Sequence, residues 1–323
     1  MIGRVNTGGG GTGGTLTVTA PANVTVTVSK DGKTKTKNSG TSGVVVFKGL
    51  ASGTWTVTIT GDDKTAKKSV VIITDYSTAI SFSTIPEFTY TGDFEIVNDS
   101  DEPISVSQDN WKIRFLTSGT LTFTNLNGAE GGIDVFLVGG GAGGNYSYRG
   151  GAGGGSGYTR TTQDITVRVG VQYDIVIGAG GAGAKTTGGR AGGVTSAFGS
   201  SANGGATLSD NGAYGGDGGS GGGSGTLNQD KDGAYSKAGV GGTDGANGQG
   251  THPGTGQGTT TREFGEPSGT LYATGGKGAA GNNITPDPVS QNTGDGGNGA
   301  GGRIESTAGG SGIAIIRNTR GAA

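Results

Sequence analysis

The run Ile133-Asp134-Val135-Phe136-Leu137-Val138-Gly139-Gly140-Gly141-Ala142-Gly143-Gly144 decides the fold, because a strand pattern passes directly into a glycine block. Its first half is almost continuously apolar, which predicts a central strand that is buried on both faces. Its second half belongs to a region, residues 128–312, in which glycine comes in blocks. Glycine makes up 76 of the 323 residues, against about 7% in an average protein. This region is therefore either disordered or a specialised structure.

Disorder is the simplest interpretation of a low-complexity glycine segment, since a fixed glycine loses more backbone entropy than any other residue. Three features favour order. Glycine recurs at every third residue, as in Gly215/Gly218/Gly221, Gly242/Gly245/Gly248 and Gly275/Gly278/Gly281, and aromatic residues interrupt the blocks, namely Tyr146, Tyr148, Phe198, Tyr214, Tyr235, Phe264 and Tyr272. The third feature is the apolar strand pattern at residues 312–317. At the end of a flexible tail it would invite aggregation, so we expect it to return to the sheet that begins before residue 139.

A three-residue period with only 7 prolines predicts glycine helices of the polyproline-II type rather than collagen. Such a helix has three residues per turn and no internal hydrogen bonds, so its amides and carbonyls point outward. Packing many such helices side by side gives every backbone group a partner, and only glycine allows the close approach that this requires. We expect these helices in insertions at about residues 139–163 and 178–311.

The rest of the chain has the pattern of β structure. Residues 1–14 form an N-terminal arm and linker, and residues 15–83 alternate Val or Ile with Thr in short runs that predict a small β-sandwich. Residues 84–323 contain a second set of strand patterns, and no window has helical periodicity. The predicted fold is all-β with essentially no α-helix. We expect strands at residues 16–19, 24–28, 44–47, 55–59, 70–73, 80–82, 88–90, 94–97, 104–106, 111–116, 121–123, 133–138, 165–169, 173–177 and 312–317.

The composition of the chain excludes several classes of function. The chain has no cysteine, which excludes disulfides, thiol catalysis and thiolate metal sites. A net charge of −2 argues against nucleic acid as a partner, because such binding depends on surplus Lys and Arg. No apolar run reaches the roughly 20 residues of a membrane span, and the first residues lack the apolar core of a secretory signal. We therefore expect synthesis in a host cytoplasm, without a signal peptide and without membrane insertion.

No residue pattern predicts catalysis, a cofactor or a metal. His252 is the one histidine, and in a polar loop it is expected to be a surface residue. Asp99-Ser100-Asp101-Glu102 could bind a divalent cation, although a solvated turn is the favoured interpretation. The glycine blocks that begin at Gly139 and Gly178 follow strands, but they lack the Lys-Ser/Thr ending of a phosphate loop. Lysines flank the two hairpins of residues 15–83, where we expect them to protect strand edges; they are Lys30, Lys33, Lys35, Lys37, Lys64, Lys67 and Lys68.

The segments between glycine blocks are the best candidates for recognition, because aromatic, Asn and Arg residues in loops on a rigid body are typical of binding surfaces. The alternative is that these segments are simple turns whose aromatic residues pack on the bundle. The candidate receptor contacts are Asn145, Tyr146, Tyr148, Arg149, Arg262, Phe264, Asn283 and Ile284.

Two resemblances to known families extend this interpretation. The runs Val44-Val45-Val46-Phe47-Lys48-Gly49-Leu50 and Gly53-Thr54-Trp55-Thr56-Val57-Thr58-Ile59 resemble the small sandwich modules called PEGA or carboxypeptidase-regulatory-like. The match covers about a fifth of the chain and implies a spacer. Residues 86–318 resemble the glycine-rich adhesin domains at the tips of tailed-phage fibres, and are similar to the extracellular glycine-rich region of anaplastic lymphoma kinase. The runs that carry this resemblance are residues 111–120, 135–141, 176–181 and 309–317.

The second resemblance implies a tumour-necrosis-factor-like or jelly-roll-like β-sandwich with an inserted bundle of polyglycine-II helices. It also implies a non-enzymatic virion protein, namely a tail fibre or receptor-binding adhesin of a phage or prophage. Its partners would be baseplate or fibre proteins, reached through residues 1–14, and a glycan or protein receptor on the bacterial surface. We expect a homo-oligomer, for which a trimer is one option. A head or collar fibre, or decoration protein, a bacterial surface carbohydrate-binding protein and a glycan-degrading fibre enzyme are the alternatives.

Overall fold

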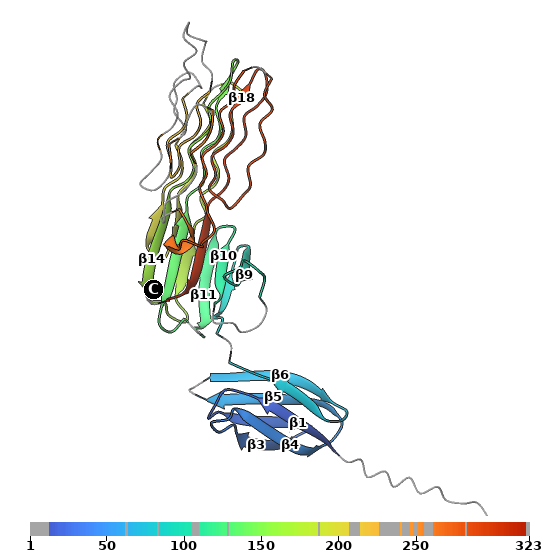
Figure 1. The fold of residues 1–323 in the computed structure, drawn as a ribbon. Helices are drawn as coiled ribbons and strands as arrows, with labels where there is room; N and C mark the ends of the chain where they lie inside the picture. Colours follow the sequence, from blue (N-terminus) through green and yellow to red (C-terminus); the bar gives the residue numbers. More distant parts are fainter. Residues whose placement is uncertain are drawn as a thin grey trace, which may run out of the picture. The chain divides into compact units, whose positions relative to one another are not determined.

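The computed structural model describes residues 13–61, 64–82, 84–104, 110–127, 129–186, 188–206, 214–225, 240, 246–247, 251–254, 261–281 and 283–320. Of the expected anchoring arm and linker at residues 1–14, residues 1–12 lie outside this set, and Gly14 already belongs to the first strand. The chain divides into two compact units, Met1–Thr84 and Ile85–Ala323 (Figure 1). Both are built from strands, and the described residues contain one short 3-10 helix and no α-helix.

Unit 1 is a small β-sandwich of two sheets, with strand orders β4-β1-β7 and β3-β2-β5-β6. Its strands are β1 Gly14–Thr19, β2 Thr25–Lys30, β3 Lys33–Asn38, β4 Val44–Leu50, β5 Gly53–Gly61, β6 Lys64–Ile72 and β7 Tyr76–Ala79. The alternation of apolar and polar residues explains the layers, because every second side chain of a strand points to the same face. In β5, Trp55, Val57 and Ile59 are buried while the threonines between them lie outward.

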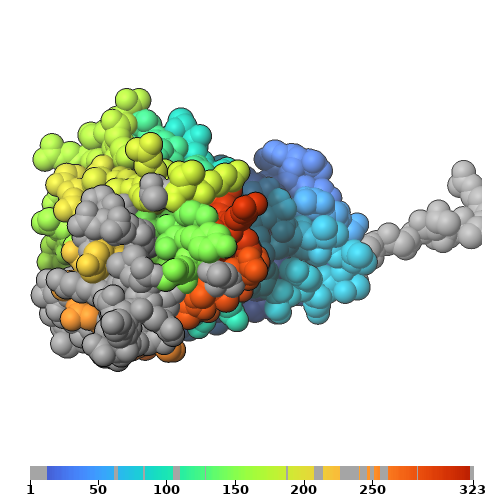
Figure 2. Space-filling model, turned by 90° about the horizontal axis from the view of Figure 1, so that it is seen from above, coloured from blue at the N-terminus to red at the C-terminus, as the bar shows by residue number. Residues whose placement is uncertain are grey.

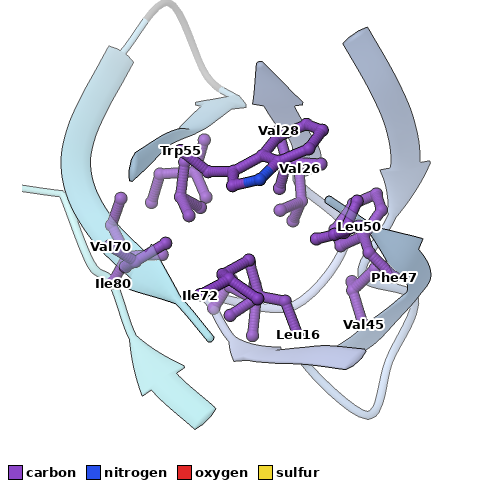
Figure 3. Packing of buried hydrophobic residues seen from close by; sticks show 14 of the residues in the cluster. Leu16, Val26, Val28, Val45, Phe47, Leu50, Trp55, Val70, Ile72 and Ile80 are labelled. Atoms are coloured by element: carbon purple, nitrogen blue, oxygen red, sulfur yellow. The ribbon is translucent and has the colours of Figure 1, made fainter. Parts of the chain in front are cut away.

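The core of unit 1 lies between these two sheets (Figure 3). Leu16, Val26 and Phe47 come from three different strands, and each is at most 1% exposed. Trp55 also packs in this core, and its indole Nε1 donates to the carbonyl of Ala51 at 2.8 Å. The polar atom of this large side chain is thus satisfied inside an apolar cluster.

Lysine side chains bridge the open sides of this sandwich, where the two sheets end. Lys35 and Lys37 of edge strand β3 donate through Nζ to the carbonyls of Lys48 and Val46 of edge strand β4, at 2.6 and 2.7 Å. On the opposite side, Lys68 of β6 donates to the carbonyl of Ala79 of β7 at 2.9 Å. These ammonium groups occupy edge carbonyls that another chain could otherwise pair with.

We predict that the double variant Lys35→Met/Lys37→Met self-associates, because it uncovers β4 carbonyls and places an apolar surface beside them. The expected loss in unfolding free energy is about 1 kcal/mol, the order of one or two hydrogen bonds. Sedimentation velocity measures the association, and Lys33→Met on the same strand is the matched control. A double variant that stays as dispersed as this control would rule out edge protection.

Unit 2 contains a second sandwich, with a five-stranded sheet of order β14-β12-β19-β10-β9 and a three-stranded sheet of order β15-β11-β8. Its strands are β8 Glu87–Tyr90, β9 Phe94–Val97, β10 Lys112–Phe115, β11 Gly119–Asn125, β12 Ile133–Val138, β14 Thr159–Ile165, β15 Gln172–Ile175 and β19 Ile313–Asn318. Two-residue strands β13 Tyr146–Ser147 and β18 Ala300–Gly301 pair with each other, as do β16 Thr195–Ala197 and β17 Ser200–Ala202.

The prediction that residues 133–138 form a central buried strand is confirmed, as is the return of the last strand. β19 pairs antiparallel with both β12 and β10, with Phe136 opposite Ile315. All six residues of β12 are buried. Val135 and Leu137 face the core between the sheets, and Phe136 and Val138 belong to a separate apolar cluster.

Two strand predictions were wrong in place, and a third lies mostly outside the described residues. Residues 165–169 were expected to form a strand, but β14 ends at Ile165 and Gly170 bonds to the carbonyl of Phe123 in a turn. Residues 80–82 lie outside a strand, since β7 ends at Ala79 and the burial of Ile80 comes from core packing. Of the strand expected at 104–106, only residue 104 is described, and it is not in a strand.

The glycine segments run as extended rods that continue from the ends of the sandwich strands (Figure 1). Residues 139–145 follow β12, and residues 150–158 return to β14. Residues 178–193 lie between β15 and β16, and further rods are found among the described residues between β17 and β19. The first insertion therefore ends at residue 158 rather than 163. The second is divided by the β16–β17 hairpin, which the sequence did not predict.

The hydrogen bonds of the rod at residues 139–145 show how the bundle is packed. Its successive amides donate in turn to the carbonyls of three antiparallel rods. The first rod is reached by the pairs Gly139–Tyr158, Ala142–Gly155 and Asn145–Ala152, and the second by Gly140–Gly193 and Gly143–Arg190. The third is reached by Gly141–Gly310 and Gly144–Thr307. Its carbonyls accept from the amides of three parallel rods. The acceptor–donor pairs are Gly140–Gly205, Gly141–Gly181, Ala142–Gly297 and Asn145–Ala300. Each turn of three residues thus serves different neighbours. The predicted bundle of laterally bonded glycine helices is present.

Close approach, rather than backbone freedom, explains the glycines of these rods. A Cβ on Gly141 would overlap the carbonyl oxygen of Asp295, and one on Gly154 would overlap that of Ala142. Ser156 shows a different use of a rod position, because its Oγ accepts from the amide of Ser220 at 2.6 Å. The chain reverses between residues 216 and 222, since the amide of Gly222 donates to the carbonyl of Gly216 at 2.8 Å. The glycines at 215, 218 and 221 therefore do not form one continuous rod, although their spacing predicted one.

Candidate recognition surface

Among the described residues, turns that join the rods lie at the end of the bundle farthest from the sandwich (Figure 1). Residues 146–150 make one such turn, in which the amide of Gly150 donates to the carbonyl of Ser147 at 3.1 Å. The turn is held to a second segment, because β13 and β18 pair with Tyr146 opposite Ala300. Short bonded turns on rigid rods give this surface a fixed backbone.

Three segments far apart in the sequence meet at this end. The amide of Gly302 donates to the carbonyl of Tyr148, and the amide of Gly281 to that of Arg149, both at 3.0 Å. Asn283 lies against Gly302, so near that a Cβ on Gly302 would contact its backbone nitrogen. Figure 2, seen onto this end, shows the green segment around residue 148 beside the red segment around residue 302.

Five of the eight predicted contact residues belong to this tip surface, which we define as Tyr146, Tyr148, Arg149, Asn283 and Ile284. Tyr148 is 61% exposed and Ile284 is 39% exposed. Arg149 and Asn283 are also exposed, and Tyr146 is half-buried. Arg303, which follows Gly302, is also exposed but was not among the predicted contacts. The sequence signal that could have identified Arg303 is its position directly after Gly302, a glycine of the tip.

Asn145 was expected to contact a receptor, and the structure contradicts this. Its side chain is fully buried. The amide of Gly189 donates to its Oδ1 at 2.7 Å, and its Nδ2 reaches the carbonyl of Tyr214 at 3.5 Å. Asn145 therefore joins rods inside the bundle, just below the tip surface.

Arg262 and Phe264 are also displaced from the predicted surface, because they belong to a segment that covers the five-stranded sheet. We call residues 261–273 the clasp; it contains the 3-10 helix η1 Glu263–Gly265, shown in orange in Figure 1. The clasp folds back on itself, with the amide of Glu263 bonded to the carbonyl of Thr270 at 2.9 Å. Phe264 is 6% exposed, and its ring packs on Phe136 at 6.0 Å. Arg262 is half-buried and donates to the carbonyl of Gly269.

Buried ion pairs fix the clasp to the sheet. Lys112 Nζ lies 2.8 Å from Glu263 Oε1 and 2.6 Å from Asp101 Oδ1. Arg317 pairs with Asp134 at 3.2 Å and with Glu266 at 2.6 Å, and its guanidinium lies 4.1 Å from the Phe264 ring centre. Burial raises the pKa of the Glu263 carboxyl, although Lys112 acts against it. Burial also raises the pKa of the Tyr272 hydroxyl.

The turn at residues 99–102 is tied into the protein by hydrogen bonds and ion pairs. Asn98 Oδ1 accepts from the amides of Ser100 and Glu102, and Asp99 pairs with Arg320 at 2.7 Å. Burial acts to raise the pKa of Asp101, but the bond from Lys112 and the charge of Arg114 lower it below the ordinary value. The described residues contain no cluster of three or more His, Cys, Asp or Glu that could hold a metal. His252 is exposed, as expected.

The described part of the chain contains no helix long and apolar enough to cross a membrane.

A β-sandwich that carries a laterally bonded bundle of glycine rods defines the class of this protein. Residues 116–319 match the family model described as a glycine-rich domain, and the chain belongs to this family. No curated protein matches the chain.

Proposed function

We propose that the protein is a non-enzymatic adhesin of a tailed phage or prophage, whose tip surface contacts the bacterial cell. The observation that carries this proposal is the convergence of Tyr148, Arg149 and Asn283 on the end of a rigid bundle. Tyr is effective in binding surfaces because it offers a large amphipathic contact area with few rotatable bonds. Arg adds planar hydrogen bonding to acidic or hydroxylated groups.

The architecture supports a role in presentation. The tip turns are held by backbone hydrogen bonds to neighbouring segments, so little entropy is lost when a receptor fixes them. The packed rods place these turns away from the sandwich (Figure 1). In this proposal residues 1–14 attach the chain to other virion proteins and unit 1 acts as a spacer.

We predict that Tyr148→Ala/Arg149→Ala weakens cell binding at least about tenfold, as expected when anchors of a contact surface are removed. The measurement is binding of the fluorescently labelled full chain to a panel of bacterial strains by flow cytometry. Unfolding temperature should change little, because both side chains are exposed and the bonds that hold the turn come from the backbone. The matched control is Arg168→Ala/Val169→Ala, which removes two exposed side chains just after the end of β14, away from the tip surface.

Immunogold labelling of purified virions tests the other half of the proposal. Gold at the ends of fibres is the expected result, and gold at the head or collar would favour the decoration role instead. Equal binding of the tip variant and the native chain would contradict the assignment of the tip surface.

A further inference from the structure

Lys112 lies between two carboxylates and is buried, unlike the lysine of an ordinary surface ion pair. Its side chain is 5% exposed, and Glu263 is 3% exposed. Asp101 completes the group, with its Oδ1 2.6 Å from the lysine Nζ. By contrast, the pairs Lys185–Glu305 and Lys277–Asp287 have every side chain at least half exposed.

We propose that Lys112 and Asp101 condense into an intramolecular isopeptide bond, with Glu263 as the group that transfers the proton. An amine and a carboxyl held at contact distance react with a very high effective concentration. The strand β10 fixes the lysine, while the turn at residues 98–102 fixes the carboxyl through the Asn98 bonds. The amine and the carboxyl are therefore held together before the reaction begins.

The reaction balances without any other reagent. The reaction starts from the minor neutral form of the pair, in which one lysine proton has passed to Asp101 Oδ1 across the bond that joins them, against the lowered pKa of that carboxyl. The neutral nitrogen then attacks Cγ of Asp101, and a C–N bond forms as one C–O bond breaks. Glu263 takes a second proton from the nitrogen and delivers a proton to the departing oxygen, which leaves as water. The amide keeps one hydrogen, and Glu263 ends in the state in which it began.

The surroundings favour this chemistry over a permanent ion pair. Taking two charges out of water is costly even when they are paired, and the amide is neutral. Burial raises the pKa of Glu263, which favours the protonated carboxyl that delivers a proton to the departing oxygen. The hydroxyl of Thr270 donates to Asp101 Oδ2 at 2.9 Å, where it can stabilise the negative charge that develops on that oxygen during the attack.

The pair Asp134–Arg317 is a natural comparison, because it is more enclosed than Lys112–Asp101, whose aspartate side chain is 30% exposed, but it cannot react. A guanidinium stays protonated in proteins and is not a nucleophile. A cavity of about 120 Å³ lined by Lys112 and Glu263 lies beside the reacting group. It is large enough for the released water to leave the site.

The test is the intact mass of the purified full chain under denaturing conditions. We expect a mass lower than that of the sequence by one water molecule, and a proteolytic product in which the peptides containing Asp101 and Lys112 are joined. Lys112→Arg should restore the full mass, while Lys185→Arg, at an exposed pair, should leave the water loss in place. Glu263→Gln should slow the condensation, which is followed by mass after refolding from denaturant.

A native chain that keeps its full mass after folding would overturn the proposal, and this result needs no variant. Water loss that persists in Lys112→Arg would also overturn it, because an aspartyl succinimide elsewhere would then be the cause. A link from Lys112 to Glu263 would contradict the assignment of Asp101 as the acyl group.

Discussion

Replacing Gly141 by alanine is expected to destabilise unit 2 by about 3 kcal/mol or more, the upper range for forced overpacking of a rigid interior. The added Cβ would overlap the Asp295 carbonyl oxygen, which is backbone and cannot rotate away. The same residue donates to the carbonyl of Gly310 at 2.9 Å and accepts from the amide of Gly181 at 2.8 Å. A shift that relieves the overlap would therefore weaken contacts with two other rods.

Calorimetric unfolding of the full chain measures this effect, with the transition of unit 1 as an internal reference. Gly131→Ala is the control, since a Cβ at Gly131 meets nothing within 4 Å, and we expect it to change stability by no more than about 0.5 kcal/mol. If Gly141→Ala were as mild as this control, the rods would be separated more widely than described.

Replacing Arg317 by methionine should cost about 3–5 kcal/mol, the usual effect of leaving a buried charge without its partner. Asp134 is fully buried, and it lies directly opposite Arg317 in the β12–β19 register. The substitution also removes the guanidinium that stacks on Phe264 and bonds to Glu266, so the clasp should loosen. Chemical denaturation measures the loss in unfolding free energy.

The double variant Asp134→Asn/Arg317→Met separates charge from packing, because it removes both members of the pair. We expect it to be more stable than Arg317→Met alone, since the uncompensated carboxylate is gone. Lys185→Met, at an exposed pair, should change stability by no more than about 1 kcal/mol. Equal stability of the single and double variants would show that the buried charge has no energetic role.

The sandwich and the glycine rods of unit 2 could be predicted because the residue pattern of each segment matches its place in the fold. Residues 133–138 are apolar enough to require cover on both faces, and residues 313–316 need a sheet to return to. The three-residue glycine period has one backbone solution that satisfies its hydrogen bonds by lateral packing. Both features follow from backbone hydrogen bonding and apolar area, which can be read directly from the sequence.

The clasp and the interior role of Asn145 could not be predicted in the same way. Phe264 adopts φ 55° within a three-residue helix, a conformation uncommon outside glycine, and no periodicity marks the segment around it. Asn145 follows Gly144 without any change of pattern, so a rod position and a loop position look alike. A signal was present for the ion pair, because Asp134 interrupts one apolar run and Arg317 ends another.

The central claim is that the glycine region is a solid bundle whose main-chain amides are bonded between rods. Hydrogen–deuterium exchange of the full chain, followed over peptides that span residues 139–158, tests it most directly. The amides of Ala142, Gly154 and Gly157 have partners at 2.8, 2.8 and 2.7 Å, so this segment should stay protected as long as strands β12 and β19. Exchange at the rate of an unstructured peptide throughout these residues would contradict the account.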